Sequence, residues 1–334
     1  MKLSDKYKLQ SILVAMAIYL ALVVLVGSLL GVSLDQLLFG SVITGFMLGA
    51  FEEYYVQSRQ GTWLRQLHPV LEITLYSLVI LLLFFSVSYI THAVFGRLDQ
   101  LYRVYARLHI VIPAFIALSV VTITCLRVIS FIGGRNLFHL ISGKYHRPLI
   151  EKRLFLFLDM KGSTQIVERL GAVKTREMIG QFFFDISQPI TDNDGEIYRF
   201  TGDGMVAVWD FDKGVKDNQV IRAIDSIITA ISSKADYYQK TFDQIPQFRI
   251  GVHGGDIVVC QEGSTKRAIG FYGETIHIAA RIEQTAKKMD KNYLLSGQVV
   301  NHLAGIDNRL LKIGELELRG IHTPVTAYQL LPAK

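Results

Sequence analysis

Two aspartates in this sequence stand where short apolar runs end or begin, and they are the residues best placed to do chemistry. Asp159 follows the apolar run 155–158, and Asp203 lies between Gly202 and Gly204, just ahead of a second apolar run. This pattern predicts two buried strands that carry carboxylates at the rim of a sheet. The 44 residues from 159 to 203 leave room for a helical crossover, so we expect both side chains to converge on divalent cations. Two carboxylates that share Mg²⁺ or Mn²⁺ favour phosphoryl chemistry.

A helix is expected directly after the first aspartate. Gly162, Ser163 and Thr164 lie where this helix would begin. The free backbone N–H groups and the positive dipole end of a helix can hold phosphate oxygens. Taken alone, Asp159 could instead be the N-cap of this helix, and Gly204 and Gly273 could serve only to permit turns. The combination of the two aspartates favours the metal site.

The C-terminal half must position these residues, and its pattern alternates between strands and helices. Helices are predicted at about 164–188, 215–240 and 274–288, with a short helix at 296–304. A strand at 247–253 is expected to turn back into a hairpin partner at 255–260. The other predicted strands lie at 153–158, 195–200, 204–210, 267–272, 292–295, 309–318 and 325–331. This predicts a single sheet with helices packed on it, in a domain long enough to bury its own core.

Five motifs in this half resemble those of the class III nucleotidyl cyclase family. The resemblance covers residues 150–332 and implies a ferredoxin-like α/β catalytic domain over 153–334. It also implies a membrane-anchored, bacterial-type enzyme that converts ATP to 3′,5′-cyclic AMP and diphosphate. Catalytic domains of the family pair head to tail, so a homodimer with shared active sites is expected. The motifs are residues 159–164, 202–204, 249–255, 273–283 and 316–328.

The resemblance implies roles for individual residues. Asp159 and Asp203 look like the carboxylates that bind two Mg²⁺ or Mn²⁺ ions per site, with the Met160 carbonyl as a further ligand. Arg281 matches the arginine that stabilises the transferring phosphate, a role suited to a planar charged fork. Alternatively, Arg281 could form a surface ion pair with Glu283. The residues that correspond to phosphate and triphosphate contacts are Gly162, Ser163, Thr164 and, by a looser alignment, Arg319.

Three positions depart from the family pattern. Arg199 stands where many adenylyl cyclases have a purine-reading lysine, although a cross-strand ion pair is an alternative use. Gly270 replaces the side chain that reads the adenine amino group. His277 occupies the position of the transition-state asparagine, where its ring could donate a hydrogen bond or could be buried and satisfied. Neither purine-reading position carries the Glu or Cys expected of a guanylyl cyclase, which favours ATP over GTP.

These departures keep an alternative function open. A degenerate, cyclase-like domain could bind nucleotides as a sensor or scaffold with little turnover. A cyclase of relaxed or other nucleotide specificity, regulated by a ligand of the N-terminal half, is a second alternative. Tests of product formation and of nucleotide binding distinguish these functions.

The N-terminal half has a different composition. The chain of 334 residues is 50% hydrophobic with mean hydropathy +0.32, yet 19% of its residues are charged. We therefore expect the apolar and the charged residues to lie in different parts of the chain. Four apolar runs of about 20 residues or more are long enough to cross a membrane as helices. They lie at 10–32, 35–55, 71–95 and 104–131. We therefore predict a four-helix transmembrane domain over 1–133 and a connector over 134–152.

The charge distribution argues against a nucleic-acid partner. Of 35 Lys and Arg residues and 29 Asp and Glu residues, 12 and 6 lie in residues 1–150, which leaves 23 and 23 for residues 151–334. The whole net charge of +6 therefore belongs to the apolar half. A neutral C-terminal half offers no basic stripe to a nucleic acid, whereas basic residues beside apolar runs suit anionic lipid head groups.

An even number of spans would leave both termini and the catalytic domain on the cytoplasmic side of the cell (inner) membrane. Basic residues before the first run, between the second and third, and after the fourth agree with this orientation, although Arg97, Arg103 and Arg107 oppose it. The two cysteines, Cys125 and Cys260, form no disulfide framework.

Three histidines in the N-terminal half raise the question of a haem. His68, His92 and His109 lie near the ends of apolar runs, and facing histidines in a helical bundle can ligate haem iron. Interfacial histidines that bond lipid or backbone explain the same pattern, so a haem is the weaker interpretation.

Overall fold

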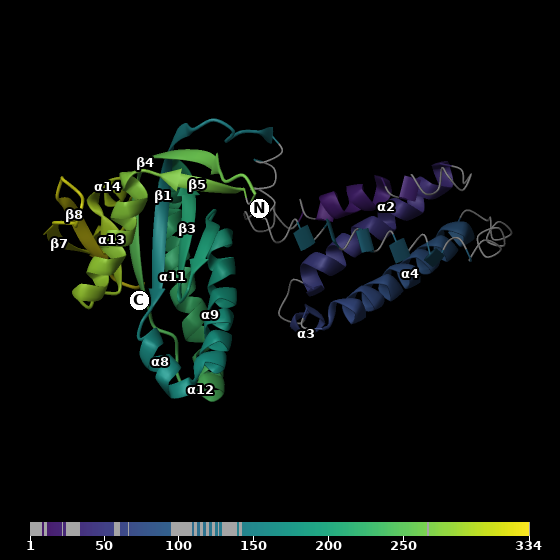
Figure 1. Ribbon diagram of the computed structural model, residues 1–334, viewed down its shortest axis with the longest axis horizontal. Coiled ribbons are helices and arrows are strands. Elements are labelled where there is room, and N and C mark those ends of the chain that lie inside the picture. The colour runs from purple at the N-terminus through teal and green to yellow at the C-terminus, as the bar shows by residue number, and fades with distance from the viewer. Residues whose placement is uncertain are drawn as a thin grey trace. The chain divides into compact units, whose positions relative to one another are not determined.

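The computed structural model describes residues 142–333 apart from residue 266. In the N-terminal half it describes residues 12–21, 34–56, 61–65 and 67–94, together with scattered positions elsewhere. These residues form two compact units that divide at residues 142 and 143. Figure 1 shows a sheet with its helices in the C-terminal unit and a group of helices in the N-terminal unit.

The C-terminal unit is built on one eight-stranded sheet. Its spatial order is β2-β3-β1-β4-β6-β8-β7, with β5 paired to β4, and β4–β6 is a parallel pair. The first four strands, with their helices, follow the βαββαβ order and the β4-β1-β3-β2 arrangement of a ferredoxin-like sheet. The strands are β1 (Leu149–Met160), β2 (Glu196–Thr201), β3 (Gly204–Asp210), β4 (Phe248–Glu262), β5 (Ala268–Tyr272), β6 (Tyr293–Ser296), β7 (Leu310–Leu316) and β8 (Val325–Leu330).

Helices cover both faces of this sheet, and the alternation of side chains along β1 explains how. Leu154 and Leu156 point to the face covered by α9 (Ala172–Asp192) and α11 (Gln219–Ser233). Phe155 points to the other face, where it joins a cluster with residues of α13 (Glu274–Lys288). Figure 1 shows β1 and β4 between these helices. The remaining short helices are α8 (Ser163–Leu170), α10 (Phe211–Val215), η3 (Lys216–Asn218), α12 (Ala235–Phe242), α14 (Gly297–Val300) and η4 (Asp307–Arg309).

The predicted turn between residues 253 and 255 was wrong. β4 runs without a break from Phe248 to Glu262, and its hairpin partner is β5. Gly254 pairs with Leu154 in the β1–β4 ladder. A β-carbon at Gly254 would lie 2.6 Å from the ring of Phe211, so this glycine permits close packing rather than a turn.

The predicted helix at 164–188 is two helices. Gly171, with φ 77° and ψ 163°, separates α8 from α9. This backbone conformation suits glycine and ends the first helix.

The N-terminal unit contains α2 (Leu34–Phe51), η1 (Glu52–Val56), α3 (Thr62–Arg65) and α4 (Pro69–Val94). Within α4, residues Val70–Val87 have a mean hydropathy of 2.4 and are the one stretch of the described residues long and apolar enough to span a membrane. A shorter apolar helix covers Ile12–Ala21. Much of the predicted runs 10–32 and 104–131 lies outside the described residues. The predicted four-span bundle is therefore not supported by this structure.

Two glycines allow helices of this unit to approach closely. A β-carbon at Gly45 would lie 3.1 Å from Cα of Met16, and one at Gly49 would lie 2.9 Å from Cα of Ile12. Glycines spaced four apart are typical of helix pairs in membranes, where small residues let backbones touch.

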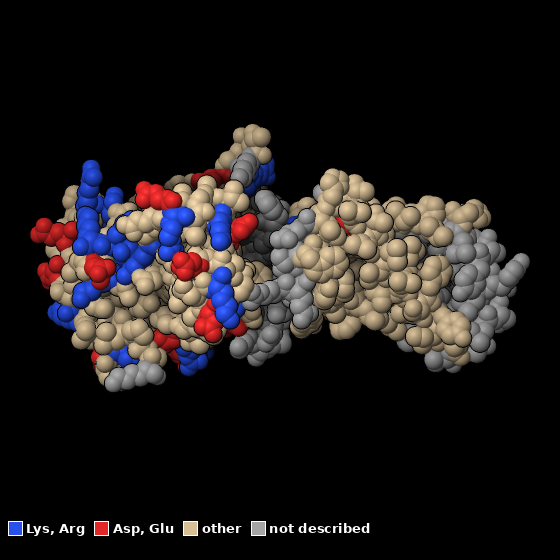
Figure 2. Space-filling view, turned by 90° about the horizontal axis from the view of Figure 1, so that it is seen from below, with Lys and Arg blue, Asp and Glu red and all other residues tan. Residues whose placement is uncertain are grey.

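The two units also differ in their surfaces. Figure 2 shows Lys, Arg, Asp and Glu spread over the C-terminal unit, whereas the visible described surface of the N-terminal unit is almost free of them. On α4 the exposed side chains include Leu71, Leu78 and Leu82.

Candidate active site

The two predicted metal-binding aspartates meet at one end of the sheet. Asp159 lies next to the end of β1 and pairs with Gly204, the first residue of β3. Asp203 lies in the two-residue turn between β2 and β3, and its carbonyl accepts a hydrogen bond from the Met160 backbone N–H at 3.3 Å. Gly202 takes a positive φ of 66°, which this tight turn requires.

Gly204 also permits the close approach of the two strands. A β-carbon at this position would lie 2.7 Å from the Leu158 carbonyl oxygen and 3.3 Å from Oδ1 of Asp159. Any larger residue would displace the backbone beside the carboxylate.

The electrostatics of this corner suit a bound cation. Burial raises the pKa of Asp159, and the negative charge of Asp203 raises it further, while Lys287 and Arg249 act in the opposite sense. Two carboxylates that repel each other in a half-buried corner are stabilised by a divalent cation between them. Among the described residues, no group of three or more His, Cys, Asp or Glu side chains could hold a metal. The two carboxylates and the backbone carbonyl of Met160 are oxygen donors, the type of ligand that Mg²⁺ and Mn²⁺ prefer.

Arg249 joins this corner, although the sequence analysis assigned it no role. It lies directly opposite Asp159 in the β1–β4 ladder, so the two side chains share a face of the sheet. Only 12% of its side chain is exposed, and its buried Nε has no hydrogen-bond partner. Its nearest carboxylate contact is a loose one of 3.8 Å to Asp290. A buried guanidinium with a free donor beside two aspartates can bind an anionic oxygen.

Helix α13 covers the same corner. A β-carbon at Gly251 would lie 2.3 Å from the backbone nitrogen of Glu283, so this glycine allows the helix to rest on β4. Burial is the main reason that the pKa of Glu283 is raised to about 7, and the negative charges of Asp159 and Asp203 raise it further. The positive charges of Lys287 and Arg249 lower this pKa. Glu283 Oε1 is buried without a hydrogen-bond partner. The sequence pattern of residues 274–288 predicts the helix. It does not predict that Glu283 faces the aspartates.

The N-terminus of α8 is free to bind a ligand. The helix begins at Ser163, and its N-cap, Gly162, makes no side-chain capping bond. The first bond of the helix runs from the Ile166 N–H to the Gly162 carbonyl, at 3.0 Å. The N–H groups of Ser163 and Thr164 therefore have no partner within the helix, as the sequence predicts for a phosphate cradle.

His277 and Arg281 lie on α13 but on a different side from the acidic corner. Residues 283 and 287, which interact electrostatically with Asp159, are a turn apart on one face of the helix. At 100° per residue, the midpoint of positions 277 and 281 lies about 120° away from the midpoint of this pair around the helix axis. His277 is exposed, and Arg281 donates to Oε1 of Gln284 at 2.7 Å. Thus one copy of the chain does not bring these two residues to its own aspartates.

The remaining predicted site residues lie on β2, on β5 and in the turn after β7. Arg199 is exposed on β2, with its guanidinium carbon 5.0 Å from the centre of the Tyr198 ring. Gly270 is buried on β5, opposite Cys260. Arg319 is exposed in the turn that follows β7, and no described contact joins it to Asp159 or Asp203.

The buried histidine of β4 has a structural role. His253 Nδ1 lies 2.8 Å from the hydroxyl of Ser296. Burial lowers the pKa of His253 to about 4, so its ring is neutral near pH 7.

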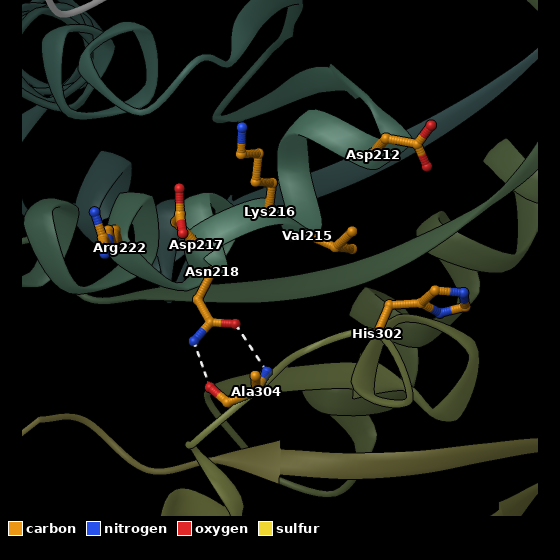
Figure 3. Close-up of a pocket in the computed structure, with 8 residues that line it drawn as sticks. All are labelled: Asp212, Val215, Lys216, Asp217, Asn218, Arg222, His302 and Ala304. Carbon is orange, nitrogen blue, oxygen red and sulfur yellow. Dashed lines mark hydrogen bonds between the residues drawn. The ribbon is translucent and has the colours of Figure 1, made fainter.

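A separate concavity of about 550 Å³ lies between η3, the start of α11 and the segment after α14. Figure 3 shows the Asn218 amide bonding both backbone groups of Ala304, at 2.7 and 3.1 Å, across its rim. Its charged lining mixes Asp212 and Asp217 with Lys216 and Arg222. None of the predicted site residues lines it.

Comparison with known proteins agrees with this geometry. Residues 149–332 match the adenylate and guanylate cyclase catalytic domain. The chain belongs to this family. Its C-terminal unit is accordingly a nucleotidyl cyclase domain, whose substrate is a nucleotide.

Three known proteins illustrate the relationship. Adenylate cyclase 2 of Rhizobium meliloti (strain 1021) is 29% identical over 280 residues, which cover 81% of this chain and 76% of that protein. An uncharacterized protein of Mycobacterium tuberculosis (strain CDC 1551 / Oshkosh) is 27% identical over 171 residues, which cover 51% of this chain but 30% of that protein. A bacterial light-regulated adenylyl cyclase has the same fold, with a TM-score of 0.57 and 16% identity over 66% of this chain and 65% of that one.

Proposed function

We propose that this chain is a membrane-anchored adenylate cyclase that converts ATP to 3′,5′-cyclic AMP and diphosphate as a homodimer. The observation that carries this proposal is the convergence of Asp159 and Asp203 at one end of the sheet, with Arg249 opposite Asp159 in the same corner. The name of the Rhizobium relative, Adenylate cyclase 2, supports ATP as the substrate.

Asp159, Asp203 and the Met160 carbonyl would hold two Mg²⁺ or Mn²⁺ ions. Such ions, when bound, activate the ribose 3′-hydroxyl and neutralise charge on the triphosphate. Arg249 and the free N–H groups at Ser163 and Thr164 bind the triphosphate oxygens and fix their orientation. These groups act in a half-buried corner, where electrostatic interactions are stronger than in water.

The arrangement of α13 supports the homodimer. The helix turns Glu283 and Lys287 to the aspartates of its own chain and leaves His277 and Arg281 on another side. In a head-to-tail pair, Arg281 and His277 of one copy can reach the phosphate bound by the aspartates of the second copy. Arg281 would stabilise charge on the α-phosphate, with His277 as a hydrogen-bond donor. The role of Arg319 as a triphosphate contact also belongs to this proposal.

Membrane anchoring is supported by the surface of the N-terminal unit. Leucines on the exposed side of α4 need an apolar environment, and residues Val70–Val87 are long enough to cross a bilayer. We infer a multi-pass anchor of four spans in the cell (inner) membrane, with the cyclase domain in the cytoplasm and lipid rather than nucleic acid as the partner. A ligand of this unit, such as haem, stays a prediction from the sequence.

Product analysis tests the proposal. The purified full-length chain is incubated with Mn²⁺ and ATP, and the product is identified by mass spectrometry. We expect 3′,5′-cyclic AMP, and we expect Asp203→Asn to reduce its formation by about 100-fold or more, because the ions supply several kcal/mol of charge stabilisation. Undiminished activity in Asp203→Asn would refute the metal assignment.

A nucleotide-binding sensor with little turnover is the second candidate function. It is motivated by Gly270 and His277, which differ from the family pattern. Tight ATP binding without product, with Mg²⁺ and with Mn²⁺ and for all four nucleotides, would favour it over the enzyme.

A further inference from the structure

The space that a side chain would occupy at Gly270 is already filled by two neighbours. A β-carbon at Gly270 would lie 2.6 Å from Cε2 of Tyr272 and 3.0 Å from Oε2 of Glu262. Tyr272 donates a hydrogen bond from its hydroxyl to the same Oε2 of Glu262. The glycine is thus the residue that lets an aromatic ring and a carboxylate occupy this position.

The β4–β5 pairing brings these three residues together. Glu262 is the last residue of β4 and pairs with Ala268, and Cys260 pairs with Gly270. Positions 262, 268, 270 and 272 therefore share one face of the hairpin. On this face the carboxylate of Glu262 supplies an anionic acceptor where Gly270 has none.

Arg199 lies in the same neighbourhood. The Tyr198 ring packs edge-to-face on Phe271 of β5, with ring centres 4.8 Å apart, and the guanidinium carbon of Arg199 lies 5.0 Å from the centre of the Tyr198 ring. Burial is the largest influence on Tyr198 and raises its pKa, the charge of Arg199 lowers it, and the charge of Glu262 raises it. Both charged groups are thus within electrostatic reach of one phenol.

One donor and one acceptor, such as Arg199 and Glu262, match the polar groups along one edge of adenine. Arg199 can donate to the ring nitrogen N1, which is an acceptor, and a carboxylate can accept from the 6-amino group, which is a donor. We propose that Glu262, held by the Tyr272 hydroxyl, is a base-specificity residue that accepts a hydrogen bond from the 6-amino group of adenine. This inference rests on the proposed function, and it assigns to β4 a role that the side chain at position 270 cannot fill.

The test compares ATP with purine riboside triphosphate, which lacks only the 6-amino group. Affinity is measured on the full-length chain with Mn²⁺ by displacement of a fluorescent nucleotide, and kcat/KM is measured in parallel. The wild type should prefer ATP by about 10-fold to 100-fold, the range for one hydrogen bond to a charged group. Glu262→Ala should lower the affinity for ATP by that factor and change the affinity for the analogue by no more than about 2-fold.

Two further variants and a control sharpen the result. Glu262→Gln keeps an acceptor without charge, so it should retain part of the preference, and Tyr272→Phe should lose less than Glu262→Ala because it removes only the support of the carboxylate. Gln261→Ala, the neighbouring position on the opposite face of β4, should leave the preference unchanged. Equal losses for both nucleotides in Glu262→Ala, or no loss for either, would overturn the inference.

The outcomes separate this inference from the proposed function. Cyclic AMP formation with a preference that persists in Glu262→Ala would remove the role of Glu262 and leave the cyclase activity intact. Absence of product, with a binding preference for ATP that disappears in Glu262→Ala, would support the base contact and refute catalysis. A Glu262-dependent preference for GTP over ATP would contradict the contact to the 6-amino group.

Discussion

Helix α4 and helix α11 are both regular and rich in aliphatic residues, but they present opposite surfaces. On α11, Ile224 and Ile227 are fully buried against the sheet, and Arg222 is exposed. On α4, Leu78 and Leu82 are more than half exposed. An amphipathic helix packs one face on a protein core and presents the other face to water, whereas a helix that is apolar on all sides is typical of a membrane span or of the core of a large protein. Exposed leucines on α4 and buried isoleucines on α11 therefore distinguish the two helices.

The two regions also handle buried charge differently. In α4, the buried Glu72 is paired with Arg127. In the cyclase domain, the buried Arg153 joins Glu151 and Asp210, and it also donates to the Tyr145 hydroxyl at 3.1 Å. The network around Arg153 connects the segment before β1 with Asp210 at the end of β3. The start of the same strand, Gly204, directly follows Asp203. Glu72 and Arg153 are thus both compensated by partners, as the cost of desolvation requires.

The largest expected effect concerns the cyclase domain alone. Arg249→Ala should lower kcat/KM for ATP by about 100-fold, since it removes a buried donor fork from the acidic corner. Membrane association should not change, which would show that catalysis and membrane binding depend on different units. Arg222→Ala, an exposed arginine at the separate concavity of Figure 3, is the control and should keep full activity. Equal kcat/KM in both variants would contradict the role of Arg249.

A second change addresses the N-terminal unit. Leu78→Lys should disfavour membrane insertion of α4 by about 3 kcal/mol, because Leu78 lies at the middle of the apolar stretch Val70–Val87. The fraction of protein recovered in membranes measures this effect. Leu311→Lys, at an exposed leucine of β7, is the matched control and should leave recovery unchanged. Equal membrane recovery for the two variants would contradict a membrane-spanning role for α4.

A third change tests the buried network of the cyclase domain. Arg153→Met should reduce the free energy of unfolding by about 2–3 kcal/mol, since Glu151 and Asp210 lose their shared partner. Fluorescence of the buried Trp209 follows unfolding of this domain. Lys213→Met, which removes an exposed partner of Asp210 at 3.2 Å, should cost less than about 0.5 kcal/mol. Similar losses from both substitutions would show that burial of Arg153 is unimportant.

The smallest expected effect is a dependence of stability on pH. The pKa of Glu283 is about 7 in the folded chain against 4.5 as its ordinary value, so the unfolded state loses its proton first as pH rises. The resulting destabilisation begins above pH 4.5 and is complete above about pH 7. Glu283→Gln should therefore stabilise the metal-free chain at pH 8 by about 1 kcal/mol, after allowance for solvent screening, and have no effect below pH 4.5.

Thermal unfolding in the presence of a chelator measures this difference. Glu315→Gln, on an exposed part of β7, serves as the control and should have the same stability as the wild type at both pH values. A gain at low pH, or none at pH 8, would mean that burial and the charges of the acidic corner do not raise the pKa of Glu283.

Much of the catalytic fold could be predicted because its signals are local. The apolar runs before Asp159 and after Asp203 predict β1 and β3, and the family match over residues 149–332 confirms the cyclase domain. The hairpin at residues 253–255 was mispredicted because Gly254 has a packing role against Phe211, which is distant in sequence. The four spans were predicted from apolar runs alone, and one described stretch, Val70–Val87, is long and apolar enough to cross a membrane.

The sequence by itself determined the chemistry on offer: two aspartates beside glycines, a helix start that follows them, and an arginine and a histidine four residues apart on a later helix. Residue type and spacing are sufficient for this, because strand and helix periods are local properties of the chain. Only the tertiary structure decided that Arg249 stands opposite Asp159 and that Glu283 faces both aspartates. It also decided that Tyr272 and Glu262 fill the space at Gly270. Strand register and the rotation of a packed helix depend on contacts between distant segments, which no local pattern encodes.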